Sequence, residues 1–340
     1  MKEIWSSLFD LADQLKLIAP WDSMYEDELF GVQDPETGEI GIMSIMGHNG
    51  EHFAIARYPG SYGLHTFKKM YEASGDSIFD QVGIIMSNHQ LQLSWEMKMD
   101  LEKHDLALIK KVGKKYRRSP EVLLPRFQSV DPGFLPWMLP DDQCPIFKTA
   151  LEQTIEVISR PKNERKLKHG KDKYLVRVCK EGQWEDQIQT ILPEEPPIKI
   201  VSRIPKLESL QKITRRIDTV ELMLQLTPIP LSEKKGRPYF PMMLFMVDPA
   251  SRMILHFELL APLPSLEAAW GAVAEKIAEV FHKQNLLPAN IKVDSKILKA
   301  VMTPLASSLD IKLHLVSKLK AGPAIFEQIM SSMTSGFNFE

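Results

Sequence analysis

The spacing of hydrophobic residues over the first 75 positions changes from helical to alternating. A helical repeat at i, i+3 and i+4 predicts a helix over residues 3–17, and its apolar positions are Trp5, Leu8, Phe9, Ala12 and Leu15. Residues 29–32 and 40–45 flank a turn with proline and glycine, which predicts a β-hairpin. A third strand at 53–56 and a helix at 63–74 follow.

The pattern then alternates between strand and helix up to residue 160. Residues 82–86 are expected to form a strand, and strict alternation over 91–99 predicts a half-buried strand. Residues 101–117 and 141–159 have helical spacing, whereas the prolines and glycine of 131–137 exclude regular structure there. The sequence therefore predicts an α+β domain with a meander-like sheet over residues 1–160.

Residues 161–200 are expected to separate two domains. The stretch 160–171 is charged and almost without apolar side chains, as is typical of a linker. Residues 174–178 and 187–191 predict a short hairpin, and 193–197 is a proline-rich spacer.

The pattern after residue 200 predicts an α/β domain over 201–340. An unbroken apolar run at 242–247 is typical of a strand covered on both faces, and a helix that joins two strands of one sheet favours a right-handed crossover. The expected elements, in chain order, are strands at 219–226, 242–247 and 253–260, a helix at 265–284, a strand at 291–293, a helix at 296–308 and a strand at 311–316.

Composition narrows the possible classes of protein. The 340 residues are 44% hydrophobic and 25% charged with a net charge of −2, so no global field holds the chain on nucleic acid or lipid. Two cysteines without a CxxC arrangement argue against a disulfide framework or a cysteine zinc site. The longest apolar run, 239–247, is too short for a membrane span. We expect a cytoplasmic protein with no membrane partner and no cofactor.

Several blocks resemble an uncharacterised bacterial family with two domains of unknown function. These blocks are residues 29–41, 44–47 and 132–137 for the N-terminal domain, and residues 236–241 with 247–249 for the C-terminal domain. The resemblance implies a bacterial cytoplasmic protein and assigns no activity.

The C-terminal element order also resembles a ribonuclease H-like or integrase-like domain. Asp248 ends one strand, Asp294 ends a later one, and Glu327 follows where a last helix is expected. In that family such acids hold two Mg²⁺ or Mn²⁺ ions for phosphodiester cleavage, which requires carboxylates that converge to within about 8 Å. Each acid also has a structural explanation, because Asp248 precedes a proline in a turn and Asp294 precedes a good helix N-cap.

The segment His48 to His52 fits the H-x-x-E-H pattern of inverted zinc peptidases. That chemistry requires both histidines on one face of a helix. Gly47 and Gly50 instead predict a turn between strands, so we expect no zinc site here.

A basic cluster with an interleaved tyrosine follows the helix predicted at 101–117. Such a cluster can contact a phosphate backbone or simply form a solvated helix end, and its members are Lys110, Lys111, Lys114, Lys115, Arg117 and Arg118. The sequence thus favours a non-catalytic binding protein with a degenerate ribonuclease H-like domain, whose partner is a protein or a nucleic acid. The alternative is a metal-dependent nuclease or transposase-like enzyme at Asp248 and Asp294.

Overall fold

The chain separates into two compact units, Met1–Glu195 and Pro196–Glu340, here called the first and second unit. No helix among the described residues is long and apolar enough to cross a membrane. The structure is a computed structural model, and it describes residues 2–72, 84, 86–167, 169–195, 204, 207–232 and 236–334.

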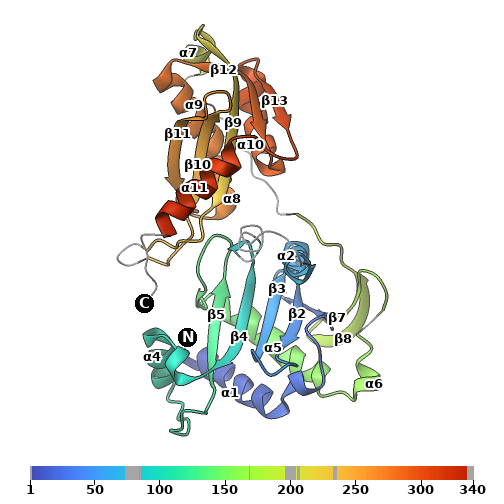
Figure 1. The fold of residues 1–340 in the computed structure, drawn as a ribbon. Helices are drawn as coiled ribbons and strands as arrows, with labels where there is room; N and C mark the ends of the chain where they lie inside the picture. Colours follow the sequence, from blue (N-terminus) through green and yellow to red (C-terminus); the bar gives the residue numbers. More distant parts are fainter. Residues whose placement is uncertain are drawn as a thin grey trace. The chain divides into compact units, whose positions relative to one another are not determined.

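The first unit is built on an eight-stranded sheet (Figure 1). All neighbouring strands are antiparallel except β1 and β7, which pair in parallel. In spatial order the strands are β6 (Trp137–Met138), β5 (Leu124–Val130), β4 (Gln90–Glu96), β3 (Ala54–Pro59), β2 (Ile40–Met46), β1 (Phe30–Gln33), β7 (Lys173–Lys180) and β8 (Gln183–Thr190).

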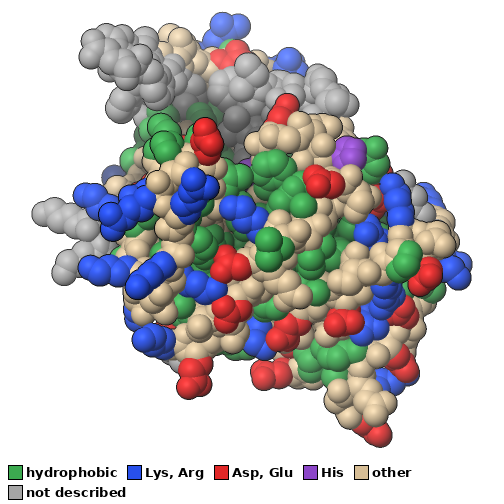
Figure 2. Space-filling view, turned by 90° about the horizontal axis from the view of Figure 1, so that it is seen from below, with side chains coloured by type: hydrophobic (Ala, Val, Ile, Leu, Met, Phe, Trp, Pro, Cys, Tyr) green, Lys and Arg blue, Asp and Glu red, His purple; other side chains and the backbone are tan. Residues whose placement is uncertain are grey.

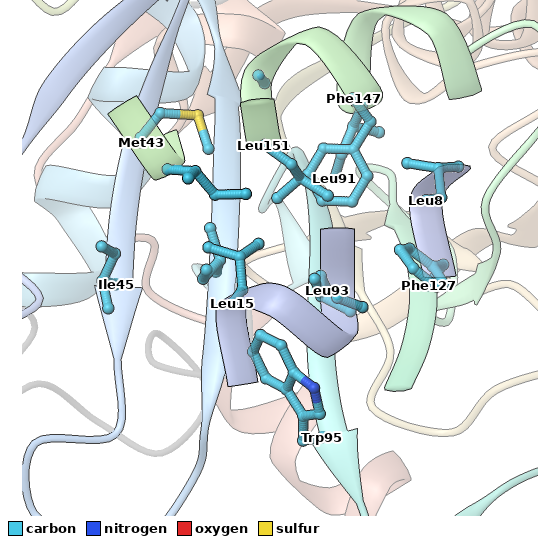
Figure 3. Close-up of a cluster of buried hydrophobic side chains, with 14 of the residues drawn as sticks. Leu8, Leu15, Met43, Ile45, Leu91, Leu93, Trp95, Phe127, Phe147 and Leu151 are labelled. Carbon is cyan, nitrogen blue, oxygen red and sulfur yellow. The ribbon is translucent and has the colours of Figure 1, made fainter. Parts of the chain in front are cut away.

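Two long helices cover one face of this sheet and form the main core. They are α1 (Lys2–Ile18) and α5 (Cys144–Ile158), and each places an apolar face on the strands. Figure 3 shows their side chains meeting those of the central strands. The labelled residues are Leu8, Leu15, Met43, Ile45, Leu91, Leu93, Trp95, Phe127, Phe147 and Leu151.

The opposite face carries a smaller core beneath α2 (Gly60–Glu72). Tyr58 of β3 and Phe67 of α2 contact edge to face there, with ring centroids 5.2 Å apart. The short elements of the unit are the 3-10 helices η1 (Pro20–Asp22) and η2 (Lys98–Asp100), and helices α4 (Lys103–Val112) and α6 (Lys162–Arg165).

The predicted helix 3–17, the first hairpin and the helix 141–159 are confirmed, with shifts of a few residues. Elsewhere the boundaries differ. Strand β4 ends at Glu96, so Met97 and Met99 of the alternating run are exposed. Of the strand predicted at 82–86, only residues 84 and 86 are described, and both are helical.

The hairpin expected between the domains belongs to the first unit. Gly31 and Val32 of β1 pair with Val176 and Arg177 of β7, so the hairpin extends the sheet beyond the boundary expected at residue 160. The charged composition of 160–171 predicted a linker, but two arginines of this segment are held within the first unit by hydrogen bonds. Arg160 binds Asp186 of β8, and Arg165 donates to the carbonyls of Arg160 and Ile158.

The second unit has a five-stranded mixed sheet. Strands β9, β10 and β11 are antiparallel to their neighbours, whereas β12 runs parallel to β9 and β13 runs parallel to β12. In spatial order the strands are β11 (Met253–Leu260), β10 (Met242–Asp248), β9 (Arg216–Leu226), β12 (Leu287–Val293) and β13 (Lys312–Leu315).

Helices lie on both faces of this sheet. Helix α11 (Gly322–Thr334) lies against β9 and β10 (Figure 1). The rings of Phe326 and Phe245 stack there, with centroids 6.2 Å apart. The single helix predicted at 265–284 is divided at Ala272, next to the poor helix former Gly271. The helices are α7 (Leu207–Gln211), α8 (Leu266–Gly271), α9 (Val273–Gln284), α10 (Lys296–Ser308) and α11 (Gly322–Thr334).

Candidate functional site

Asp248 is the last residue of β10, and its side chain stabilises the turn that follows the strand. Its carboxylate accepts hydrogen bonds from the Ala250 amide at 2.9 Å and from the Ser251 hydroxyl at 2.7 Å. The bond from Ser251 and then that from Ala250 lower the pKa of Asp248. This is the geometry of an Asp-Pro turn.

Asp294 follows β12, which flanks the central strand β9 on the side opposite to β10. Strands β10 and β12 flank β9, so they are two strand spacings, about 10 Å, apart. Val247 and Lys292 both pair with Glu221 of β9, but β10 and β12 run in opposite directions. Asp248 follows Val247 directly and Asp294 comes two residues after Lys292, so the two acids lie in opposite directions along the sheet from the level of Glu221.

Glu327, the third acid of the nuclease hypothesis, is exposed on the second turn of α11. Ser295, directly after Asp294, accepts a hydrogen bond from the Leu298 amide and caps α10. The structure thus does not bring Asp248 and Asp294 together. Among the described residues, no group of three or more His, Cys, Asp or Glu side chains is arranged to hold a metal ion.

The carboxylate at the centre of this sheet is Glu221, which the sequence reasoning missed. Its side chain is 1% exposed. One carboxylate oxygen accepts from the Lys320 amide at 2.8 Å, and the other accepts from Ala321 at 2.8 Å and Gly322 at 2.9 Å. These amides begin α11, where free N–H groups and the helix dipole favour a negative charge.

The negative charge of Glu221 acts on the carboxyl group of Asp294. The carboxyl of Asp294 is partly desolvated although its side chain is exposed, and the nearby Glu221 adds repulsion. Both effects raise the pKa of Asp294. A metal ion between these two acids would have to compete with three backbone N–H groups for Glu221, so the residues present do not fit a two-metal centre.

The H-x-x-E-H segment lies in a turn between β2 and β3, as predicted. The Nδ1 atom of His48 lies 2.9 Å from the Trp21 carbonyl oxygen. The Nε2 atom of His52 lies 3.3 Å from the Gln92 amide nitrogen, on a different strand. The two imidazoles have separate partners and do not form a zinc-binding pair.

The basic cluster begins at the end of α4. Gly113 adopts the left-handed conformation, with φ of 87°, and its amide bonds back to the Ile109 and Lys110 carbonyls. This is a glycine C-cap, and it turns the chain sharply into the loop that precedes β5. The helix therefore ends five residues before the predicted limit of residue 117.

The helix end and the loop enclose a cleft of about 1010 Å³, here called the basic cleft. Lysine and arginine side chains gather on the side of the first unit where α4 lies (Figure 2). The residues lining the cleft include six cations and no acid, and they are Lys98, Leu106, Ile109, Lys110, Gly113, Lys114, Lys115, Tyr116, Arg117, Arg118, Ser119, Pro120, Val122 and Leu124.

The structure thus brings together five of the six predicted cations and leaves out Lys111. Lys98, from η2, joins them because the chain path places it there, and no local pattern in the sequence could indicate this. Within the described part of the chain, none of Lys98, Lys110, Lys115, Arg117 and Arg118 forms an ion pair within 4.0 Å. Their charge is therefore uncompensated.

Lys114 is the exception, because it fastens the loop to α1. Its Nζ atom donates to Asp10 at 2.7 Å and to Asp13 at 2.6 Å. Partial burial alone would lower the pKa of Lys114, but these carboxylates raise it. The Tyr116 hydroxyl donates to Asp13 at 3.1 Å, and burial together with the Asp13 charge raises the pKa of this phenol.

Comparison with known families gives two matches, one within each unit of the structure. A family described as a domain of unknown function (DUF7309) matches residues 5–177, about half of the chain. A second family, also described as a domain of unknown function (DUF6930), matches residues 206–330. A comparison with curated proteins finds no match. The resemblance to two domains of unknown function is thereby confirmed. The chain belongs to the DUF7309 family, and its second unit matches the DUF6930 model.

Proposed function

We propose that the protein is a non-catalytic binding protein whose first unit holds a nucleic acid by its phosphates in the basic cleft. The observation that carries the proposal is the lining of the cleft, which has six cations and no acid in a chain of net charge −2. Phosphate contacts dominate the affinity of nucleic-acid binding proteins, and exposed lysine and arginine side chains make them. We also place the protein in the cytoplasm, since Cys144 and Cys179 are both unpaired.

The proposal gives the second unit a ribonuclease H-like fold with a structural rather than a catalytic role. The sheet order β11-β10-β9-β12-β13, with two parallel pairs after three antiparallel strands, supports this fold. The hydrogen bonds from the start of α11 to Glu221 support the structural role, because backbone N–H groups already occupy both oxygens of the central carboxylate.

Nuclease or transposase-like chemistry at Asp248 and Asp294 is a second candidate without a supporting observation. It requires Mg²⁺ or Mn²⁺ between carboxylates that converge. Asp248 instead closes its own turn, and the pairing of both strands with β9 directs the two acids apart.

The test is the salt dependence of retention on immobilised DNA that contains both native and heat-denatured strands. The test variant carries Lys110→Gln, Lys115→Gln and Arg117→Gln, which remove three cations of the cleft. The matched control carries Lys283→Gln, Lys299→Gln and Lys312→Gln, which remove three exposed lysines of the second unit. Both variants change the net charge equally.

We expect the wild type and the control to elute together, and the cleft variant to elute at clearly lower salt. The logarithm of the affinity should depend less steeply on salt in the cleft variant, by roughly 0.7 to 0.9 per lost phosphate contact. Equal weakening of both variants would mean that binding does not depend on the cleft. No retention of the wild type would contradict the proposal and direct attention to a protein partner.

A further inference from the structure

The basic cleft has an apolar floor beneath its cations. Ile109 and Leu124 are only 8% and 7% exposed, whereas Leu106 and Val122 are partly buried. The five uncompensated cations all have exposed or half-exposed positions around this floor. A site that needed only phosphate contacts would gain nothing from open apolar surface, since that surface favours an apolar occupant.

Building on the proposed function, we infer that the basic cleft takes single-stranded nucleic acid, with phosphates on the cations and a base on the floor beside Tyr116. In a duplex the bases are stacked inside and only phosphates and groove edges face the protein. A single strand can turn a base face into a cleft while its backbone stays on the rim. The charge of the cleft and its apolar floor are then both used.

Tyr116 is the residue that favours this arrangement most specifically. It lines the cleft and is half-buried, and its hydroxyl is fixed by Asp13 at 3.1 Å. Lys114 anchors the same loop to Asp10 and Asp13. A ring held by its own hydroxyl and by a neighbouring ion pair loses little further freedom on binding, as a stacking platform requires.

Two arginines of the loop extend the same chemistry. Arg117 and Arg118 follow the tyrosine directly and are exposed. A guanidinium can bind a phosphate with two parallel hydrogen bonds or stack flat on a base. The sequence Tyr116-Arg117-Arg118 therefore offers a strand one aromatic face and two planar cations in succession.

The experiment compares a labelled 12-nucleotide single strand with the duplex of the same sequence by fluorescence anisotropy at fixed salt. We expect the 340-residue protein to bind the single strand about tenfold more tightly than the duplex. Tyr116→Leu keeps an apolar side chain but removes the ring, and should weaken single-strand binding roughly tenfold. Tyr116→Phe keeps the ring and loses the bond to Asp13, so it should weaken single-strand binding less than Tyr116→Leu does.

The outcomes separate this inference from the proposed function. Duplex binding as tight as single-strand binding, still abolished by the cleft substitutions, would leave the proposed function standing and overturn the inference. Equal losses in Tyr116→Phe and Tyr116→Leu, or no loss in either, would also overturn it. No binding of either form by the wild type would overturn the proposed function first.

Discussion

The two units differ in how their most prominent charged side chains are compensated. In the first unit, five cations of the basic cleft have no ion-pair partner within the described residues, so their field extends into solvent. In the second unit, the central charge is the buried carboxylate of Glu221, and three backbone amides satisfy it. Uncompensated surface charge is available to a ligand, whereas a fully bonded buried charge is committed to the fold, which is destabilised when one partner is removed. This contrast is the reason we propose a binding role for the first unit and a structural role for Glu221 in the second.

The largest effect should come from Glu221→Ala in the second unit. The substitution leaves the buried amides of Ala321 and Gly322 and the partly buried amide of Lys320 without their acceptor. It should cost on the order of 3 kcal/mol of unfolding free energy. Urea denaturation followed by circular dichroism measures the loss. Glu327→Ala, an exposed position of α11, serves as the control and should stay within about 0.5 kcal/mol of the wild type. A loss as small as that of Glu327→Ala would show that Glu221 has no structural role in the second unit.

An intermediate effect is expected at Gly113, where the basic cleft is shaped. A Cβ atom there would meet no heavy atom within 4 Å, so any cost comes from the backbone with φ of 87°. Gly113→Ala should destabilise the protein by about 1 kcal/mol, and it should also weaken binding of nucleic acid because the loop leaves α4 differently.

Gly113→Asn is the control for this prediction, since asparagine tolerates the left-handed conformation better than alanine. Its midpoint of urea denaturation should lie between those of the wild type and Gly113→Ala. Identical stability and binding of Gly113→Ala and the wild type would show that the turn does not shape the cleft.

The smallest effect concerns pH and Asp294. Because its pKa is raised in the folded state, the folded protein binds the proton more tightly than the unfolded chain does. The resulting penalty is absent below the ordinary pKa of about 3.9, appears as the pH rises from there through the raised value, and is fully present at neutral pH.

Asp294→Asn should therefore stabilise the second unit at pH 7, by less than about 1 kcal/mol because the side chain is exposed. The gain should shrink as the pH falls through the same window, as measured by urea midpoints at several pH values. Stabilisation that is independent of pH would point to a cause other than the ionisation of Asp294.

The sequence predicted most elements but not how acids and cations are grouped. The spacing of hydrophobic residues located α1, α5 and the strands of the second unit. Burial of one face requires hydrophobic residues at regular intervals, and this pattern remains visible when single positions deviate from it. Glu221 had a visible signal, since it is the one charge within an apolar strand sequence from Val220 to Leu224. Such a residue must have a partner when buried, but its partner lies about a hundred positions away at the start of α11.

The remaining differences arise where tertiary contacts outweigh local pattern. The charged stretch after Arg160 suggested a linker, yet Arg160 and Arg165 belong to the first unit. Arg160 binds Asp186 of β8, and Arg165 donates to the Ile158 carbonyl of α5. Lys98 enters the basic cleft from a 3-10 helix, for which no spacing rule exists. Asp248 and Asp294 matched a family pattern by order along the chain, whereas their separation depends on which strands flank β9.

The parallel pairing of β1 with β7 also determines when the first unit can fold during synthesis. Phe30 and Val32 of β1 are buried, and the pairing that protects the outer edge of this strand uses Val176 and Arg177, some 145 positions later. A nascent chain that ends before the hairpin would expose an unpaired apolar edge, the kind of surface on which β-proteins aggregate. Folding of this unit thus waits for nearly all of its residues to leave the ribosome, and fragments that end near residue 160 should be prone to aggregation.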